Sequence, residues 1–237
     1  MTQFVIGDLI IDVIQKNIKN LHLSVYPPNG KIKVAAPEKM DLDSIRIYVI
    51  SKLGWIRKQQ SKFLNQERES IREFINRESH YFLGKRYLLN IIESETPPKI
   101  EIKCKTLNLY VRPNTDLLKK KELLDEWYRD QLRQILKKIV VKWEKRIGIK
   151  IEELYIKKMR TKWGSCNIES KRIWINLELA KKDIECIEYI LVHEMVHFLE
   201  RNHNSNFIAY MNRLLPEWKV IRDTLNKAPI SHVDWVY

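Results

Sequence analysis

The sequence predicts an α+β fold in which a strand-rich N-terminal half leads into a long amphipathic helix and a mainly helical C-terminal half. Apolar and polar residues alternate through much of the first hundred positions. Apolar residues recur at three- and four-residue steps over residues 117–147, and a nearly all-apolar helix surrounds residue 193. The 237 residues are 44% hydrophobic, enough for one large domain or two small ones. We expect one region over residues 1–112 and a second over 113–237, or a single continuous domain.

Strands dominate the predicted first half. The stretches with strand character are residues 21–26, 31–37, 81–83, 87–92 and 100–111. The first two flank Asn29-Gly30, a dipeptide typical of hairpin turns, and Gly84-Lys85 indicates a second hairpin. Between the hairpins, residues 41–66 show helical spacing, with Asp41 or Asp43 as the expected N-cap. No internal repeat is visible in the sequence.

The second half begins with the long helix. Its apolar stripe runs from about Leu117 to Ile147, Lys and Arg lie opposite, and Gly148 follows as a C-terminal cap. We expect that stripe to be core. The elements predicted after it are strands over 157–166 and 171–179, a helix over 184–202, a helix capped by Ser205 and ending at Leu215, and a last helix over 217–226.

Charge is unevenly distributed along the chain. The net charge of +13 divides into +6 over residues 1–111, +8 over 112–162 and −1 over 163–237. It serves either a solvated surface or attraction of an anionic partner, such as nucleic acid or a phosphate-bearing substrate.

Cysteine usage and hydropathy bound the compartment. Three widely spaced cysteines make no disulfide framework and favour a reducing, cytoplasmic location. No window approaches about 18 apolar residues, and the first ten residues lack a signal-peptide pattern, so we expect no membrane association.

One short string points to chemistry, namely His193-Glu194-Met195-Val196-His197. At four-residue spacing the two histidines share a helix face, and their ring nitrogens can converge on one ion at about 2.0–2.1 Å. The intervening glutamate is then placed to take a proton from metal-bound water. The flanking residues are apolar nearly all round, so these polar groups need partners on a buried helix. The alternative is a helix with two hydrogen-bonded core histidines.

A catalytic zinc usually has three protein ligands and one open position. His203 follows His193 by ten residues, the spacing of the zincin pattern H-E-x-x-H-x-x-G-x-x-H. Glu200, three residues after His197, is the rival ligand. We expect His203 to bind the metal, Glu200 to be a supporting or surface group, and the chain to turn at a left-handed Asn202. The other histidines are expected to be ordinary: His22, His80 and His232.

Several motifs occur together. They are Arg160-Thr161-Lys162-Trp163-Gly164-Ser165-Cys166, Ile175-Asn176-Leu177, residues 193–197, and Asn202-His203-Asn204-Ser205 with Phe207. With weaker echoes over residues 28–37, 55–56 and 83–85, they resemble the YgjP-like metallopeptidase family, a zincin group related to SprT-like and WLM proteases. By position, the resemblance implies metal ligands at His193, His197 and His203 and a catalytic glutamate at Glu194. Asn204 and Met195 depart from the family's usual serine and leucine.

The resemblance implies a metal-dependent hydrolase with one zinc per chain. We expect a metallopeptidase in which residues 173–177 align a peptide as an edge strand. Trp163 and Gly164 either line the metal cleft, as the preceding strand does in zincins, or serve packing and a bulge. Together with Asn176 they are the candidate substrate-binding residues. Cys166 and Cys186 are expected to be small buried residues.

Two other functions remain open from the residues. A nucleotide phosphoanhydride hydrolase would need a closed pocket with several cations near the metal, for which Arg160, Lys162 and Arg172 are candidates. A nucleic-acid-associated protease would bind the nucleic acid through its basic long helix. A peptide enzyme instead needs an open groove along an edge strand.

Overall fold

A computed structural model describes residues 2–26, 30–64, 72–159 and 162–227. The chain forms two compact units that divide between Glu69 and Ser70. Residues 72–111 therefore pack with the C-terminal region that carries the metal motif. The predicted division into a strand-rich region over residues 1–112 and a metallohydrolase region over 113–237 stays a prediction.

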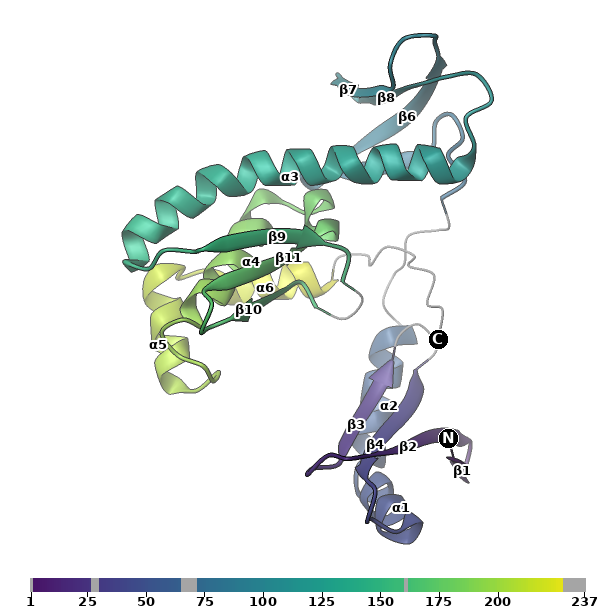
Figure 1. Ribbon diagram of the computed structural model, residues 1–237, viewed down its shortest axis with the longest axis vertical. Helices are drawn as coiled ribbons and strands as arrows, with labels where there is room; N and C mark the ends of the chain where they lie inside the picture. The colour runs from purple at the N-terminus through teal and green to yellow at the C-terminus, as the bar shows by residue number, and fades with distance from the viewer. Residues whose placement is uncertain (1, 27–29, 65–71, 160–161, 228–237) are drawn as a thin grey trace. The chain divides into compact units, whose positions relative to one another are not determined.

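The first unit is a four-stranded sheet with two helices (Figure 1). Its elements are β1 (Thr2–Ile6), β2 (Leu9–Lys16), β3 (His22–Tyr26), β4 (Lys31–Pro37), α1 (Leu42–Ser51) and α2 (Leu53–Leu64). The strand order is β1-β2-β4-β3, and β2 and β4 are parallel. Strands β3 and β4 confirm the first predicted hairpin, whose turn at 27–29 lies outside the described residues. Strands β1 and β2 were not individually predicted.

The predicted helix over residues 41–66 is two helices. Asp41 is the N-cap, and its carboxylate accepts from the Ser44 N–H at 2.7 Å. Helix α1 ends at Ser51. Its C-cap, Lys52, has a backbone outside the helical region, and α2 starts at the next residue. Alternate residues of the strands and the inner face of the helices form a buried core: Ile11, Val13, Ile32, Val34, Ile45, Val49 and Ile56.

The second unit begins with a sheet of the same design. Its strands are β5 (Ser79–Phe82), β6 (Lys85–Glu93), β7 (Lys99–Lys103) and β8 (Thr106–Val111). The order β5-β6-β8-β7, with β6 and β8 parallel, reproduces the order and directions of β1–β4. Strands β5 and β6 form the second predicted hairpin, at Gly84-Lys85. The architecture is thus repeated although the sequence shows no repeat, because alternating apolar positions specify the sheet without fixing residue identity.

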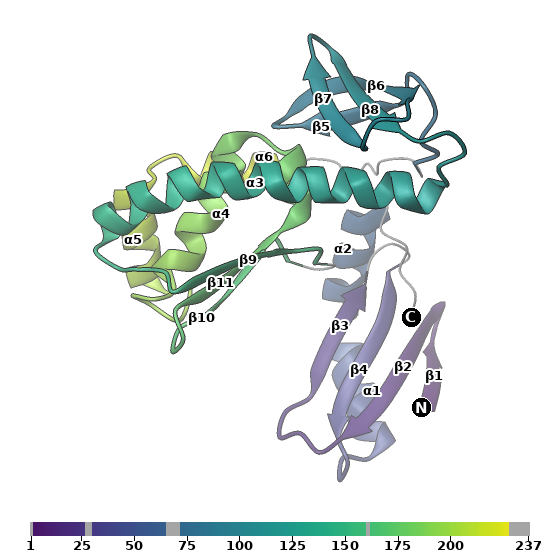
Figure 2. The ribbon, with the colours of Figure 1, turned by 45° about the horizontal axis from the view of Figure 1, so that its top comes forward.

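Helix α3 (Leu117–Ile147) is the scaffold of the second unit. It lies between the β5–β8 sheet and the layer containing α4, as two views show (Figure 1, Figure 2). Its bounds match the prediction at both ends. Asp116 caps the N-terminus, and Gly148 adopts the left-handed conformation with φ of 80°. The predicted stripe is buried, confirming it as core: Leu124, Tyr128, Leu132, Leu136, Ile139 and Trp143.

A three-stranded sheet borders the metal motif. Its strands are β9 (Glu153–Lys157), β10 (Gly164–Asn167) and β11 (Arg172–Asn176), in the order β10-β11-β9. The prediction missed β9 and extended the later strands too far, since Leu177–Lys181 forms the 3₁₀ helix η1. Residues 173–177 were expected to be an edge strand, which is wrong. Strand β11 pairs on both sides, and β10 and β9 are the two edges of the sheet.

Three helices complete the unit: α4 (Ile184–Val196), α5 (Ser205–Leu214) and α6 (Trp218–Lys227). Helix α4 ends six residues earlier than predicted, with His197 as its C-cap. The N-cap of α5 is Asn204 rather than Ser205, and its side chain accepts from the Phe207 N–H at 3.1 Å. Within the described ranges, no helix is long and apolar enough to cross a membrane.

Candidate active site

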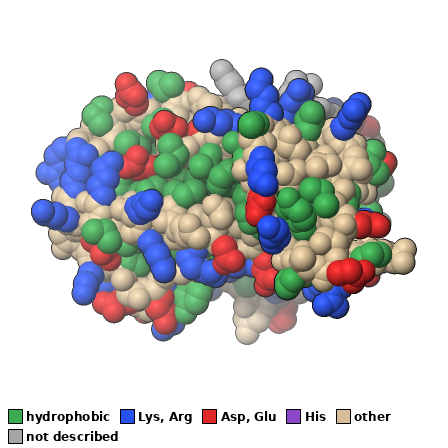
Figure 3. Space-filling view, turned by 90° about the horizontal axis from the view of Figure 1, so that it is seen from above, with side chains coloured by type: hydrophobic (Ala, Val, Ile, Leu, Met, Phe, Trp, Pro, Cys, Tyr) green, Lys and Arg blue, Asp and Glu red, His purple; other side chains and the backbone are tan. Residues whose placement is uncertain are grey.

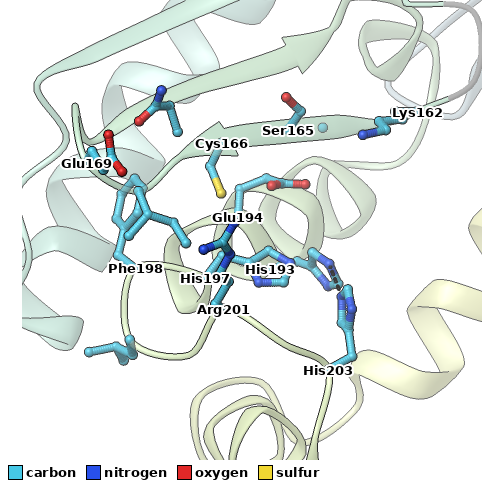
Figure 4. A pocket seen from close by; sticks show the side chains of 14 residues that line it. Lys162, Ser165, Cys166, Glu169, His193, Glu194, His197, Phe198, Arg201 and His203 are labelled. Carbon is cyan, nitrogen blue, oxygen red and sulfur yellow. Dashed lines mark hydrogen bonds between the residues drawn. The ribbon is translucent and has the colours of Figure 1, made fainter. Parts of the chain in front are cut away.

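Three histidine side chains meet at the end of helix α4. Ligand atoms of His193, His197 and His203 all lie within 4.8 Å of one another. The Nε2 atoms of His193 and His203 are 2.9 Å apart, and the rings of His193 and His197 are nearly perpendicular at 85°. The helix supplies the first two at four-residue spacing, and the following loop returns the third (Figure 4). The structure thus brings together the three residues expected to bind a metal.

The loop between α4 and α5 places His203. It immediately precedes Asn204, the N-cap that starts α5, so the cap fixes the chain direction at this point. Asn202 does not have the left-handed backbone that the sequence led us to expect, since its φ is not positive. Phe207, one turn into α5, packs against all three imidazoles with ring centroids 4.6–5.0 Å away. Its ring forms an apolar wall beside the cluster.

Glu200 supports the cluster from the side. The backbone carbonyl of Glu200 lies 3.2 Å from the Nδ1 of His197, and its carboxylate accepts from the Asn202 N–H at 3.3 Å. A proton on Nδ1 of His197 leaves the Nε2 lone pair free to face the other histidines. Glu200 contributes no atom to the group of ligand atoms found among the described residues.

Burial keeps His193 and His197 neutral. Desolvation, followed by the nearby His197 and His203, lowers the pKa of His193 to about 3. Burial also lowers the pKa of His197. Both imidazoles therefore carry lone pairs at physiological pH, which is the form that binds metal. The buried Nδ1 of His193 has no hydrogen-bond partner among the described residues.

Glu194 lies one residue along the helix and is 7% exposed. Burial raises the pKa of its carboxyl group to about 7, although a hydrogen bond from Cys166 and the charge of Lys162 oppose the shift. A carboxylate of this kind can accept a proton at neutral pH and later return it, which suits a general base. The thiol of Cys166 is correspondingly hard to ionise, since burial and then Glu194 raise its pKa to about 12.

Gly164 lets strand β10 approach this carboxylate. A Cβ atom at Gly164 would lie 2.7 Å from Oε1 of Glu194 and 2.8 Å from Cγ2 of Ile190. No ordinary side chain fits at those distances without moving the helix or the glutamate. The strand and the catalytic helix are thus in direct contact because residue 164 is glycine.

A cleft of about 880 Å³ opens over the cluster. Its lining combines strand β10, the following turn and the end of α4 with its loop: Lys162, Gly164, Ser165, Cys166, Asn167, Ile168, Glu169, His193, Glu194, His197, Phe198, Leu199, Arg201 and His203. Gly164 is therefore in the cleft, as one of the two expected alternatives had it.

Two candidate substrate-binding residues are not among the cleft's lining. Trp163 packs against the hydrophobic core, with the Lys182 ammonium 5.9 Å from its ring centroid. Asn176 is buried, and its amide donates to the carbonyls of Met159 and Lys162 at 2.9 and 2.8 Å. Asn176 thus holds the chain entering β10, and its substrate-binding role stays a prediction.

The remaining expectations have mixed outcomes. Among the candidate cations, Lys162 lines the cleft, Arg172 forms an ion pair with Glu153 and is not among the lining, and Arg160 lies outside the described residues. His80 is buried against Glu78, His22 is exposed, and His232 lies outside the described residues. Cys186 is buried and is not among the cleft's lining either.

Sequence reasoning missed the contact of Cys166 with Glu194 and the ring wall made by Phe207. The spacing of Cys166 from the metal motif carries no signal, because strand and helix meet only in the tertiary fold. Phe207 could have been found, because it is an aromatic residue three positions after the Asn204 cap, and the structure shows it buried there.

A sequence profile described as YgjP-like, metallopeptidase domain, matches residues 19–228. The crystal structure of the metallopeptidase zymogen abylysin from Pyrococcus abyssi is similar with 19% identity and a TM-score of 0.34, covering 40% of this chain and 90% of that one. The corresponding zymogen of Methanocaldococcus jannaschii jannalysin has 24% identity, a TM-score of 0.33, and coverage of 40% and 92%. No curated protein matches in sequence.

Proposed function

This chain belongs to the YgjP-like metallopeptidase family, and we propose that it hydrolyses peptide bonds with a zinc ion held by His193, His197 and His203. One observation carries the proposal. Three imidazoles whose ligand atoms lie within 4.8 Å of one another stand beside a buried carboxylate on the same helix.

The donor set fits zinc. In a tetrahedral site with Zn–N distances of about 2.0–2.1 Å, two ligand nitrogens lie about 3.3 Å apart. The Nε2 atoms of His193 and His203 are 2.9 Å apart, which a small ring movement converts to that spacing. Three histidine ligands leave a fourth position open, as catalytic zinc sites require.

The chain's own residues then carry the proton transfers. A bound zinc supplies Lewis acidity, which polarises a carbonyl and lowers the pKa of water. Glu194 takes a proton from the attacking water at its carboxylate and returns it to the leaving amine, which its pKa of about 7 permits near neutral pH. Cys166 holds that carboxylate by donating its S–H, and Phe207 with the core of the unit excludes solvent from behind the histidines.

Strand β10 supplies the surface for a peptide. It is an edge of its sheet, and its residues line the cleft directly beside Glu194. An extended peptide can add to such an edge through backbone hydrogen bonds, which requires no particular side chain. This function belongs to β10 rather than to residues 173–177.

The nucleotide alternative finds less support. A phosphoanhydride site needs several cations converging near the metal, whereas Lys162 and Arg201 are the cations in the described lining of an edge-strand cleft.

The basic charge likewise favours no nucleic-acid partner. Along α3, several cations are already paired with carboxylates, as in Lys119–Glu122, Arg133–Asp130 and Lys142–Glu188. Figure 3, which looks down on this side of the molecule, shows Lys and Arg side chains interspersed with Asp and Glu, with a group of cations at the left. This pattern suits a solvated surface.

The test is metal analysis combined with peptide cleavage. We expect one zinc per purified chain, loss of zinc and of cleavage in His203→Ala, and retention of both in His22→Ala, the control histidine on the surface of the first unit. Retention of zinc by His203→Ala together with its loss from Glu200→Ala would reassign the third ligand. Zinc binding without cleavage of any peptide in a broad library would reject the peptidase.

The cytoplasm remains our proposed location. Cys104, Cys166 and Cys186 are all free thiols, which suits a reducing compartment.

A further inference from the structure

The cleft carries opposite charges at its two ends. Lys162 precedes strand β10 and Glu169 follows it in the turn, and both line the cleft. Figure 4 shows the two side chains at opposite ends of the strand with Glu194 pointing between them. Because an extended chain rises about 3.3 Å per residue, the seven steps from Lys162 to Glu169 span at most about 23 Å.

The catalytic carboxylate divides this span. Glu194 is in contact range of Gly164 and accepts a hydrogen bond from Cys166, so it lies over the middle of β10. Lys162 is near enough for its charge to lower the pKa of Glu194. Groups on either side of a cleaved bond would therefore face opposite charges.

Both ends are anchored by buried or turn hydrogen bonds. The carbonyl of Lys162 accepts from the Asn176 amide at 2.8 Å, and the Asn167 side chain accepts from the Ser170 N–H at 3.0 Å, which closes the turn around Glu169. The backbone positions of the two charges are thus set by the fold, while their side chains extend into the cleft.

Neither charge is neutralised by a neighbour. Within the described part of the chain, neither Lys162 nor Glu169 forms a salt bridge, in contrast to Lys158 and Arg172, which pair with Asp125 and Glu153. The lining also includes the charged side chain of Arg201, which comes from the loop between His197 and His203 and not from β10 or its flanking turn.

We propose that the cleft selects peptides by charge polarity, with a basic group on the N-terminal side of the cleaved bond facing Glu169 and an acidic group on the C-terminal side facing Lys162. This inference rests on the proposed peptidase function and names its substrate class. The orientation runs antiparallel to β10, which begins near Lys162 and ends near Glu169. Antiparallel pairing is also slightly the more stable arrangement for an added strand.

Two heptapeptides of identical composition test the polarity. Both are acetylated and amidated; one carries lysine near its N-terminus and glutamate near its C-terminus, and the other has those two residues exchanged. We expect the zinc-loaded enzyme to cleave the first with a kcat/KM roughly five- to tenfold higher, mainly through KM, and to lose the preference at high salt, because exposed pairs contribute little and are screened.

Variants assign the preference to the two residues. Lys162→Glu combined with Glu169→Lys should invert it, and Lys162→Gln alone, a milder change at an exposed position, should reduce it. Lys138→Gln, which removes one positive charge from α3 outside the cleft's lining just as Lys162→Gln does within it, should leave the preference intact. An unchanged preference in the charge-swapped and Lys162→Gln variants, or equal cleavage by the wild-type protein, overturns the inference.

Binding separates this inference from the peptidase proposal. Calorimetric titration of zinc-loaded Glu194→Gln with the two peptides should show the same polarity. If the protein binds the two peptides selectively but the wild-type protein cleaves neither, the peptidase proposal is rejected and the charge selection is retained. If the wild-type protein cleaves both peptides without selectivity, the charge selection is rejected and the peptidase proposal is retained.

Discussion

Each compact unit contains a buried carboxylate whose pKa is shifted, and the two shifts have opposite directions. In the first unit, Asp12 on β2 is 0% exposed and lies 3.0 Å from the Lys31 ammonium, while Gln3 donates to it at 2.6 Å. Burial alone would raise its pKa, but those hydrogen bonds and the charges of Lys31 and Lys33 outweigh burial and lower it. In the second unit, burial dominates and raises the pKa of Glu194 to about 7.

The difference lies in the partner and not in the burial. The Lys31 ammonium contacts the Asp12 carboxylate directly and stabilises its ionised form, so Asp12 loses its proton easily. Among the described residues, Glu194 accepts from a weak thiol donor and is influenced by the charge of Lys162 without forming an ion pair with it, so its carboxylate keeps a higher affinity for a proton. Burying a carboxylate without a contacting cation lowers the stability of the fold. Carboxylates with pKa values shifted in this way are concentrated at functional sites.

The largest expected effect comes from removing the unpaired carboxylate. Glu194→Gln keeps the size of the side chain but cannot accept a proton, so kcat for peptide cleavage should fall at least about 10²–10⁴-fold. Zinc content should stay at the wild-type level. Steady-state kinetics and metal analysis of the same preparation measure both quantities.

The matched change in the other unit is Asp12→Asn, which should leave kcat at the wild-type value. Equal losses of activity in the two variants would break the comparison, because burial and not the missing counter-ion would then be the common cause.

The second effect concerns how closely β10 approaches Glu194. Gly164→Ala places a methyl group where Oε1 of Glu194 and Ile190 lie, so the carboxylate must move. We expect kcat to fall roughly 10- to 100-fold, since displacement of a catalytic group by about 1 Å can cost 10²-fold, while zinc is retained. Gly54→Ala is the control, because a Cβ there meets no atom within 4 Å. Full activity of Gly164→Ala would mean that the glutamate position is not set by this contact.

Local patterns predicted the parts of this site that lie close in sequence. The spacing of His193 and His197 specified one helix face, and the stripe of α3 together with Gly148 specified that helix to the residue. His203 followed from a ten-residue spacing that a short loop can close.

The errors arose where tertiary contacts decide. Residues 173–177 look like any short apolar strand, and nothing local reveals that β9 pairs on their far side. The sequence also does not reveal that the Asn176 amide donates to the carbonyls of Met159 and Lys162, because these contacts form only in the tertiary fold. The repeat of the two four-stranded sheets was not predicted, because alternation of apolar residues specifies a sheet without fixing the residue at each position.

A third effect measures what the paired carboxylate contributes to stability. Asp12→Asn removes the negative charge that faces the Lys31 ammonium, and we expect a loss of about 1–2 kcal/mol in the stability of the first unit, at the low end for hydrogen bonds to charged groups because Lys31 can reach solvent. Amide hydrogen exchange of peptides spanning β2 and β4 measures this loss of stability in the first unit. Unchanged protection would mean that the pair contributes nothing net.

The same pair predicts a pH dependence. Since the folded-state pKa of Asp12 is lowered, its contribution is fully present above the unfolded value of about 3.9 and is lost as pH falls through the folded value. Protection of β2 and β4 should therefore decline below about pH 4 in the wild type. It should decline less in Asp12→Asn, which has no proton to take up at this position.

The smallest effect tests the donor that Glu194 has in place of an ammonium. Cys166→Ala removes the S–H that the Glu194 carboxylate accepts, and a single hydrogen bond of about 0.5–1.5 kcal/mol corresponds to a two- to tenfold loss. We expect about threefold in kcat, because a thiol is a weak donor, with KM and zinc content unchanged. Cys166→Ser restores an O–H donor of similar reach and should retain wild-type kcat, whereas a role in packing alone would make serine as harmful as alanine. If alanine proved as active as cysteine, the position of Glu194 would depend on its burial against Gly164 and Ile190 alone, and the comparison with Asp12 would reduce to the presence or absence of the lysine.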